Sequence, residues 1–86
     1  MKELVELLAR ALVDRPEAVD VRETDNASTI SLELRVAPGD VGHVIGRQGR
    51  TIKAMRTLVH AAAIRSQKDA TLEVIDEEQD ARRAGG

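Results

Sequence analysis

The sequence lacks cysteine and all three large aromatic residues. The absence of cysteine excludes a disulfide framework, a thiolate metal site and a cysteine nucleophile. The absence of Phe, Tyr and Trp excludes RRM and OB-type nucleic-acid binders in their ordinary form, because these domains hold bases on aromatic stacking platforms. The material for a core is aliphatic: 42% of the 86 residues are hydrophobic, and alanine is the commonest of them. This length and composition predict one small domain with a modest core.

Long apolar runs are also missing. No run reaches the length that a membrane-spanning helix needs. The acidic residues Glu3 and Glu6 fall where a signal peptide would be apolar. We therefore expect no membrane association and a cytoplasmic location.

The net charge of −2 hides an uneven distribution. Residues 35–68 carry 7 basic and 1 acidic side chains, whereas the segments on either side are acidic. A positive middle between negative ends predicts a local anion-binding surface. The alternative is a basic, solvated helix face, and charge alone does not separate the two interpretations.

Hydrophobic periodicity divides most of the chain into helices and strands. Apolar residues at spacings of three and four indicate helices, and strict alternation indicates strands with one buried face. The predicted helices cover residues 2–13, 41–45 and 50–66, and the predicted strands cover residues 19–23, 30–36 and 70–75. We expect Asp40 to act as the N-cap of the short helix. The buried side of the long helix should consist of Ile52, Met55, Val59 and Ala62.

This element order, α-β-β-α-α-β, predicts an α+β fold. The first two strands should form an antiparallel hairpin, and the third follows a helical crossover that lets it lie parallel to the second. The result is a three-stranded mixed sheet with the helices packed on one face. We expect residues 1–75 to form the domain and the acidic residues 76–86 to form a flexible tail.

The chemically informative segment is the four-residue turn Gly46-Arg47-Gln48-Gly49 between two predicted helices. Glycine permits positive φ angles and close approach of another backbone. The second helix directs unpaired N–H groups and the positive end of its dipole toward the turn, which suits a phosphate. Arg50 and Lys53 add cations beside it. The alternatives are a plain junction between two helices and a solvated basic face.

The stretch Val44-Ile45-Gly46-Arg47-Gln48-Gly49-Arg50-Thr51-Ile52 resembles the signature loop of a KH domain, Ile-Gly-x-x-Gly-x-x-Ile. The element order is similar to that of the type II KH fold. Over about residues 1–75 the chain resembles the single-KH-domain RNA-binding proteins of the bacterial KhpA (YlqC) family.

This resemblance implies binding of single-stranded RNA. In KH domains the loop clamps the backbone of about four nucleotides. The bases lie in a narrow groove between the two helices and the edge of the sheet, held by aliphatic contacts and hydrogen bonds. Gly46 and Gly49 would shape the clamp, while Arg47 and Gln48 would face the phosphates. The implied groove floor consists of Val41, Val44, Ile45 and Ile52. The residues predicted to bind RNA are Val44, Ile45, Gly46, Arg47, Gln48, Gly49, Arg50 and Lys53.

The long helix carries a second surface away from its buried side. On a helical wheel this surface contains Thr57, His60, Ala61 and Ile64. We expect Ile64 to pack against another copy or a related domain, although a single exposed isoleucine is also ordinary. The resemblance implies a homodimer, or a heterodimer with a KhpB-like protein, a larger chain with its own KH domain.

Patterns of nucleotide-binding enzymes are absent, and His43 and His60 lie in different predicted helices. We therefore expect no enzymatic activity, no metal site and no cofactor. The favoured function is a small RNA-binding module, and the resemblance implies an RNA chaperone or post-transcriptional regulator linked to cell shape. The alternative is a KH-fold protein-interaction module without a direct RNA role.

Overall fold

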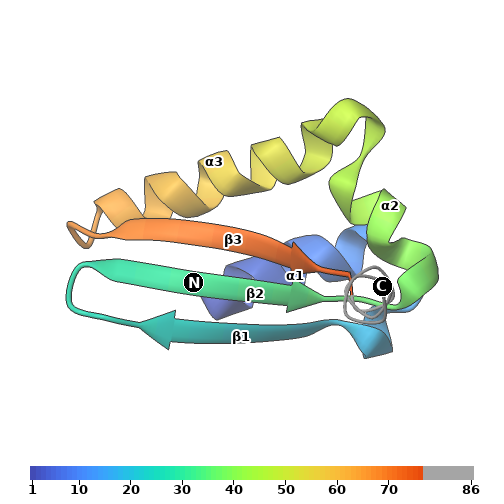
Figure 1. Ribbon diagram of the computed structural model, residues 1–86, viewed down its shortest axis with the longest axis horizontal. Helices are drawn as coiled ribbons and strands as arrows, with labels where there is room; N and C mark the ends of the chain where they lie inside the picture. The colour runs from blue at the N-terminus through green and yellow to red at the C-terminus, as the bar shows by residue number, and fades with distance from the viewer. Residues whose placement is uncertain (77–86) are drawn as a thin grey trace, which may run out of the picture.

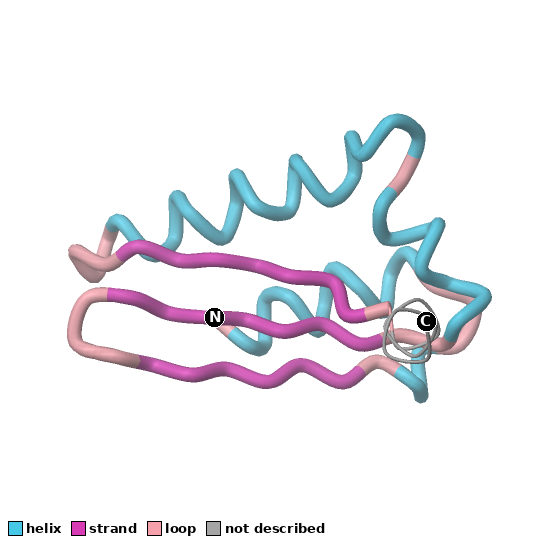
Figure 2. Tube along the Cα trace, viewed as in Figure 1, coloured by secondary structure: helices cyan, strands magenta, loops and turns pink. Residues whose placement is uncertain are grey.

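The computed structural model describes residues 1–76 and contains the six predicted elements in the predicted order (Figure 1). The helices are α1 (Lys2–Leu12), α2 (Val41–Ile45) and α3 (Arg50–Ile64), and the strands are β1 (Asp20–Asp25), β2 (Thr29–Arg35) and β3 (Asp69–Ile75). The predicted boundaries differ from these by at most two residues. Three short 3₁₀ turns were not predicted, at Pro16–Ala18, Pro38–Asp40 and Arg47–Gly49 (Figure 2). The expected tail lies outside the described residues apart from Asp76.

The three strands form one mixed sheet in the order β1-β2-β3. β1 and β2 are antiparallel, whereas β2 and β3 are parallel, so that Leu32 lies between Glu23 and Leu72. α1 packs against β1, α3 packs against β3, and the two helices contact each other. This arrangement confirms the predicted α+β fold with helices on one face of a mixed sheet. β3 is an edge strand, because β2 is its single partner in the sheet.

The core lies between the sheet and the helices and is aliphatic throughout. The alternating residues Ile30, Leu32 and Leu34 of β2 are buried, as the period of two predicts. On α3 the prediction of Ala62 as a core residue is wrong, because Ala63 is buried instead and Ala62 is only partly covered. The buried residues of α3 advance by four positions after Met55, which keeps them close to one line along the helix.

The opposite face of the sheet is polar. It presents Arg22 beside Glu33 and Thr24 beside Ser31 in the antiparallel ladder. This face therefore offers a position for charge-changing control substitutions far from the helices. Within residues 1–76, no helix is both long enough and apolar enough to cross a membrane.

Asp40 is the one buried charged side chain of the described core, with 3% of its surface exposed. Its two carboxylate oxygens accept hydrogen bonds from the backbone N–H groups of Asp14 and Arg15, each at 3.0 Å. Asp40 occupies the N-cap position of α2 but makes no capping bond there, so the predicted capping role is wrong. The carboxylate instead ties the chain that leaves α1 to the start of α2, which carries the glycine turn.

The bond from the Asp14 N–H is the largest cause that holds the pKa of the Asp40 carboxyl below its ordinary value of 3.8, with burial opposing it. A carboxylate with a lowered folded-state pKa stabilises the fold above its unfolded pKa and loses that effect as the pH falls. We predict that Asp40→Asn lowers the urea midpoint at pH 7, because an amide cannot face both N–H donors with oxygens. The difference in urea midpoint between the variant and the unsubstituted protein should become smaller below about pH 4.

The matched control for this prediction is Asp20→Asn, because Asp20 is an exposed acid on β1. It should change the midpoint little at either pH. A difference between the Asp40 variant and the unsubstituted protein that stays constant from pH 7 to pH 3 would contradict the carboxylate clamp.

Candidate functional site

The turn between α2 and α3 has an unusual backbone. Gly46, Gln48 and Gly49 all have positive φ angles, of 77°, 56° and 72°. The Gly49 N–H donates to the Gly46 carbonyl at 3.1 Å, and the Arg50 N–H donates to the Arg47 carbonyl. These two bonds close the turn on itself and set the direction in which α3 begins.

Different structural constraints favour glycine at positions 46 and 49. A Cβ on Gly46 would lie 2.6 Å from Cβ of Thr51 and 2.9 Å from its backbone nitrogen. At Gly49 a Cβ would meet no atom within 4 Å, so only the positive φ angle favours glycine there. Gly46 is therefore required by a close backbone approach, and Gly49 by backbone conformation alone.

The backbone donors available to a ligand lie at the variable positions of the turn. The sequence predicted unpaired N–H groups at the start of α3, but the bonds described above occupy those of Gly49 and Arg50. Among the described residues, the N–H groups of Arg47 and Gln48 have no backbone acceptor. The turn thus uses the N–H groups of Gly49 and Arg50 to close itself, and those of Arg47 and Gln48 add to the donors expected at the start of α3.

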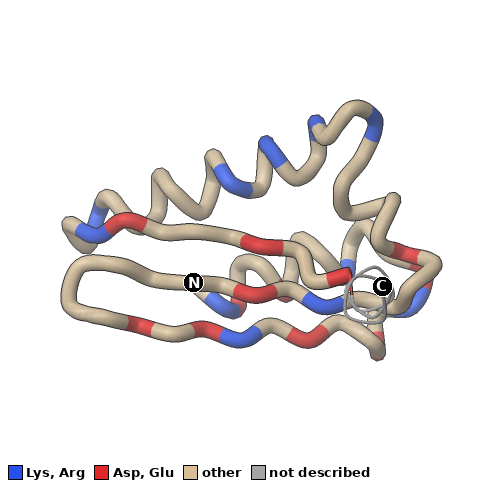
Figure 3. The backbone as a smooth tube through the Cα atoms, viewed as in Figure 1, with Lys and Arg blue, Asp and Glu red and all other residues tan. Residues whose placement is uncertain are grey.

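Cations surround these donors. Arg47, Arg50 and Lys53 are exposed, and α3 contains no acidic residue. The Nη2 of Arg50 lies 3.4 Å from Oε1 of Gln48, which links the first turn of α3 to the loop. Figure 3 shows Lys and Arg along the turn and α3, while Asp and Glu gather on the strands. Most of the basic residues in the middle of the sequence therefore lie on the turn and α3, whereas Arg35 lies on β2.

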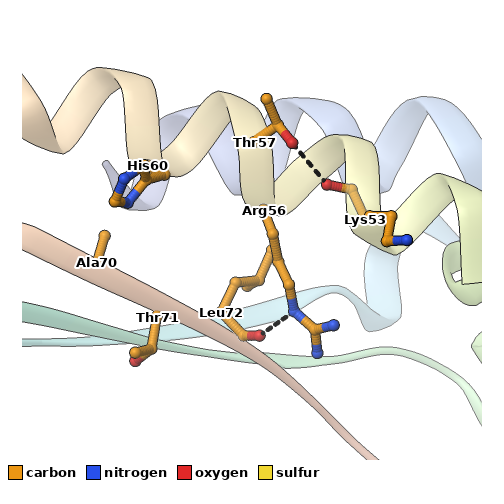
Figure 4. A pocket seen from close by; sticks show the side chains of 7 residues that line it. All are labelled: Lys53, Arg56, Thr57, His60, Ala70, Thr71 and Leu72. Carbon is orange, nitrogen blue, oxygen red and sulfur yellow. Dashed lines mark hydrogen bonds between the residues drawn. The ribbon is translucent and has the colours of Figure 1, made fainter.

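A cavity of about 450 Å³ lies between α3 and β3 (Figure 4). It is lined by Lys53, Arg56, Thr57, His60, Ala70, Thr71 and Leu72. Thr57 and His60, which the sequence assigned to a dimer surface, line this cavity with Lys53. Arg56 and the β3 residues were not predicted as part of any site. Their signal was incomplete: helical spacing groups Arg56 with Lys53 and His60, but only the parallel β2–β3 pairing brings β3 beside them.

Two of the four aliphatic residues expected on the groove floor are buried, and two are partly buried. Val44 has no exposed surface and Ile52 is 5% exposed, so both support the turn from within the core. Ile45 is partly buried and packs against that core. Val41 lines a different hollow, together with Val36 and Ile75 among others.

The remaining residues of the predicted dimer surface are exposed. Ala61 is exposed on α3. Ile64 has 58% of its surface exposed and borders a separate hollow with Ser28 and Lys68 among others. This hollow lies at the end of α3 that is farthest from the glycine turn.

Asp14, Asp40 and His43 bring ligand-type atoms within 4.8 Å of one another, although no metal site was predicted. Both oxygens of Asp40 already accept backbone hydrogen bonds. The Nε2 of His43 lies 3.4 Å from Oδ2 of Asp14, within ion-pairing distance when the imidazole is protonated. We attribute the cluster to the joining of α1 and α2.

Two helices joined by a Gly-x-x-Gly turn, on a mixed sheet whose edge strand borders the second helix, define a KH domain. A family model described as KhpA/KhpB, KH domain matches residues 2–74. The chain belongs to this KhpA/KhpB family.

The match to this chain spans the whole or nearly the whole length of its relatives. The RNA-binding protein KhpA of Clostridium perfringens is 55% identical over 75 residues, which are 87% of this chain and 100% of that protein. The RNA-binding protein KhpA of Caldanaerobacter subterraneus is 52% identical with the same coverage. That of Chlamydia muridarum is 47% identical over 77 residues, 90% of this chain and 99% of the relative. These relatives are named for RNA binding and not as enzymes. No solved structure matches the chain.

We predict that the two loop glycines respond differently to alanine. Gly49→Ala should cost about 1–2 kcal/mol, because it forces a non-glycine residue into the left-handed region without a clash. Gly46→Ala should cost clearly more, because the added Cβ also meets Thr51. Urea unfolding of both variants measures the difference, and an equal loss of stability would contradict the close approach at Gly46.

Proposed function

We propose that this chain binds single-stranded RNA in the cytoplasm through the Gly46–Gly49 turn and the cavity between α3 and β3. The observation that carries the proposal is the pair of N–H groups at Arg47 and Gln48 without a backbone acceptor, in the turn before α3, whose Lys53 lines that cavity. The relatives named RNA-binding protein KhpA support the same conclusion.

The phosphate backbone occupies the turn. Two adjacent N–H donors offer hydrogen bonds to phosphate oxygens, and Arg47, Arg50 and Lys53 supply the opposite charge. Gly46 and Gly49 keep Cβ atoms away from the turn itself. Because the loop contributes only one cation, Arg50 and Lys53 provide most of the electrostatic attraction.

The bases occupy the cavity between α3 and β3. Its walls combine aliphatic surface from Ala70 and Leu72 with hydrogen-bonding groups from Thr57 and His60. A cavity of this size is within the range of small-ligand sites. This arrangement holds bases without aromatic stacking, so we expect weak binding by a single domain and little sequence selectivity beyond a few positions.

The second candidate is a protein-interaction module that keeps the fold without binding RNA. The exposed Ile64, at the end of α3 away from the turn, favours an interaction of this kind. Pairing through Ile64 is also compatible with RNA binding, because Ile64 and the turn lie at different ends of α3. A role as an RNA chaperone or post-transcriptional regulator linked to cell shape, acting with a KhpB-like partner, would use both.

We predict that the double variant Arg47→Asp with Gln48→Asp loses RNA binding, because it places two carboxylates where the phosphate should lie. The affinity for a single-stranded RNA oligonucleotide, measured by fluorescence anisotropy, should fall at least tenfold. The thermal midpoint should change little, because both side chains are exposed.

The matched control is Arg22→Asp with Asn26→Asp, which changes the net charge equally on the other side of the fold. It should keep most of the affinity. A salt titration adds a second check, since each phosphate contact on single strands contributes about −0.7 to the slope of log K against log salt. An unchanged affinity in the Arg47/Gln48 variant would exclude the turn as the phosphate site.

We also propose that Ile64 and Ala61 form a pairing surface for a second copy or for a KhpB-like domain. Thr57 and His60 were predicted as part of this surface, and their position beside Lys53 gives them a role in the cavity as well. A dimer would present two RNA sites and raise the affinity through effective concentration.

We predict that Ile64→Asp converts the dimer to a monomer while the fold remains intact, because a buried carboxylate without a partner is unfavourable at an interface. Light scattering after size exclusion measures the mass, and circular dichroism checks the fold. Leu58→Asp is the matched control, because Leu58 is 49% exposed on another side of α3. Equal masses for the Ile64 variant and the unsubstituted protein would contradict this surface.

A further inference from the structure

Arg56 crosses the cavity from α3 to β3. Its Nε donates a hydrogen bond to the backbone carbonyl of Leu72 at 3.0 Å (Figure 4). β3 is the edge strand of the sheet, so this bond joins a side chain of α3 to the backbone of the edge. The bond therefore anchors the Nε of this exposed side chain beside the edge strand.

Most of the hydrogen-bonding capacity of Arg56 remains unused. An arginine has five N–H donors, and the bond to Leu72 uses one of them. Among residues 1–76, no acidic side chain pairs with Arg56. Figure 4 shows its two terminal nitrogens beyond the bond to Leu72, on the same side as the Lys53 ammonium. The planar, positively charged guanidinium thus offers its remaining N–H donors to a ligand in the cavity.

The position of Arg56 suits a base edge better than a phosphate. A guanidinium fork can bind either a phosphate or a base edge through two parallel bonds, so its distance from the turn decides between them. The planar fork loses little entropy for each hydrogen bond that it forms. Arg56 is also six residues beyond Arg50, about 9 Å farther along α3 from the turn where the phosphates bind.

The donors select bases with two adjacent acceptors. Guanine offers O6 and N7, the acceptor pair that arginine commonly contacts in nucleic acids. Cytosine offers O2 and N3 on its pairing edge, which single-stranded RNA leaves accessible. Adenine and uracil alternate a donor with each acceptor on these edges, so a second N–H of arginine would meet another donor.

We propose that Arg56 is a specificity-determining residue that favours guanine or cytosine over adenine and uracil at one position of the bound RNA. This inference rests on the proposed RNA-binding function. It assigns the choice of base to a single side chain that the Leu72 carbonyl anchors.

The test uses the full chain and four RNA nonamers, each an oligo(A) background with A, U, C or G at the central position. Anisotropy should give about tenfold tighter binding for the G or C oligonucleotide than for the A and U ones, as one bidentate contact provides. Arg56→Lys keeps the charge but lacks the planar pair of donors, so the preference should fall below twofold while binding to oligo(A) changes little. The Arg56 Nε–H signal in a ¹H–¹⁵N spectrum should shift more with the preferred oligonucleotide than with oligo(A).

Lys53→Ala is the control, because Lys53 lines the same cavity without contacting the edge strand. It should weaken binding to all four oligonucleotides equally and leave the preference intact. Thermal midpoints of both variants check that the fold is retained, and the uncharged Arg56→Gln provides a second variant if Arg56→Lys unfolds.

Three outcomes overturn the proposal. Equal affinity for all four oligonucleotides would show that the cavity does not select bases, while leaving RNA binding itself in place. A preference that survives in Arg56→Lys and Arg56→Gln would assign selection to another residue. Absence of RNA binding by the unsubstituted protein would overturn the proposed function and this inference together.

Discussion

The close approach of Gly46 to Thr51 is the constraint on which the rest of the site depends. It allows α2 and α3 to meet at a four-residue turn that leaves no room for a Cβ at Gly46. The direction of α3 is set there, and with it the distance between α3 and the edge strand. The cavity, the position of its cations and the reach of Arg56 to Leu72 all follow from that direction. Asp40 helps to hold α2 in place before the turn, because it ties the start of α2 to the chain that leaves α1.

A protein without aromatic side chains can still present a surface suited to RNA, provided that its backbone supplies some of the hydrogen-bonding groups. In the binding mode that we propose, the backbone contributes N–H groups in the turn, and the edge of β3 anchors Arg56. Side chains would supply charge, aliphatic surface and further hydrogen bonds.

Local sequence patterns predicted the elements and their order. Alternation located β2 within one residue at each end, and the two glycines located the turn. Residues whose partners are distant in the sequence were missed. Asp40 resembles an ordinary N-cap in its local context, and only the packed structure brings it beside Asp14 and Arg15. The role of Arg56 depends in the same way on the parallel pairing of β3 with β2, since no short-range pattern reveals which carbonyl it will reach.

The bond between Arg56 and Leu72 also bears on strand pairing at the open edge of the sheet. An edge strand exposes backbone donors and acceptors that another chain's strand can pair with, and this is a recognised route to aggregation. Here a side chain from α3 already occupies one of the acceptors of β3, and the positive charge on that side chain repels a second copy arriving edge to edge. The open edge of the sheet is thereby protected at its middle, where pairing with a foreign strand would otherwise begin.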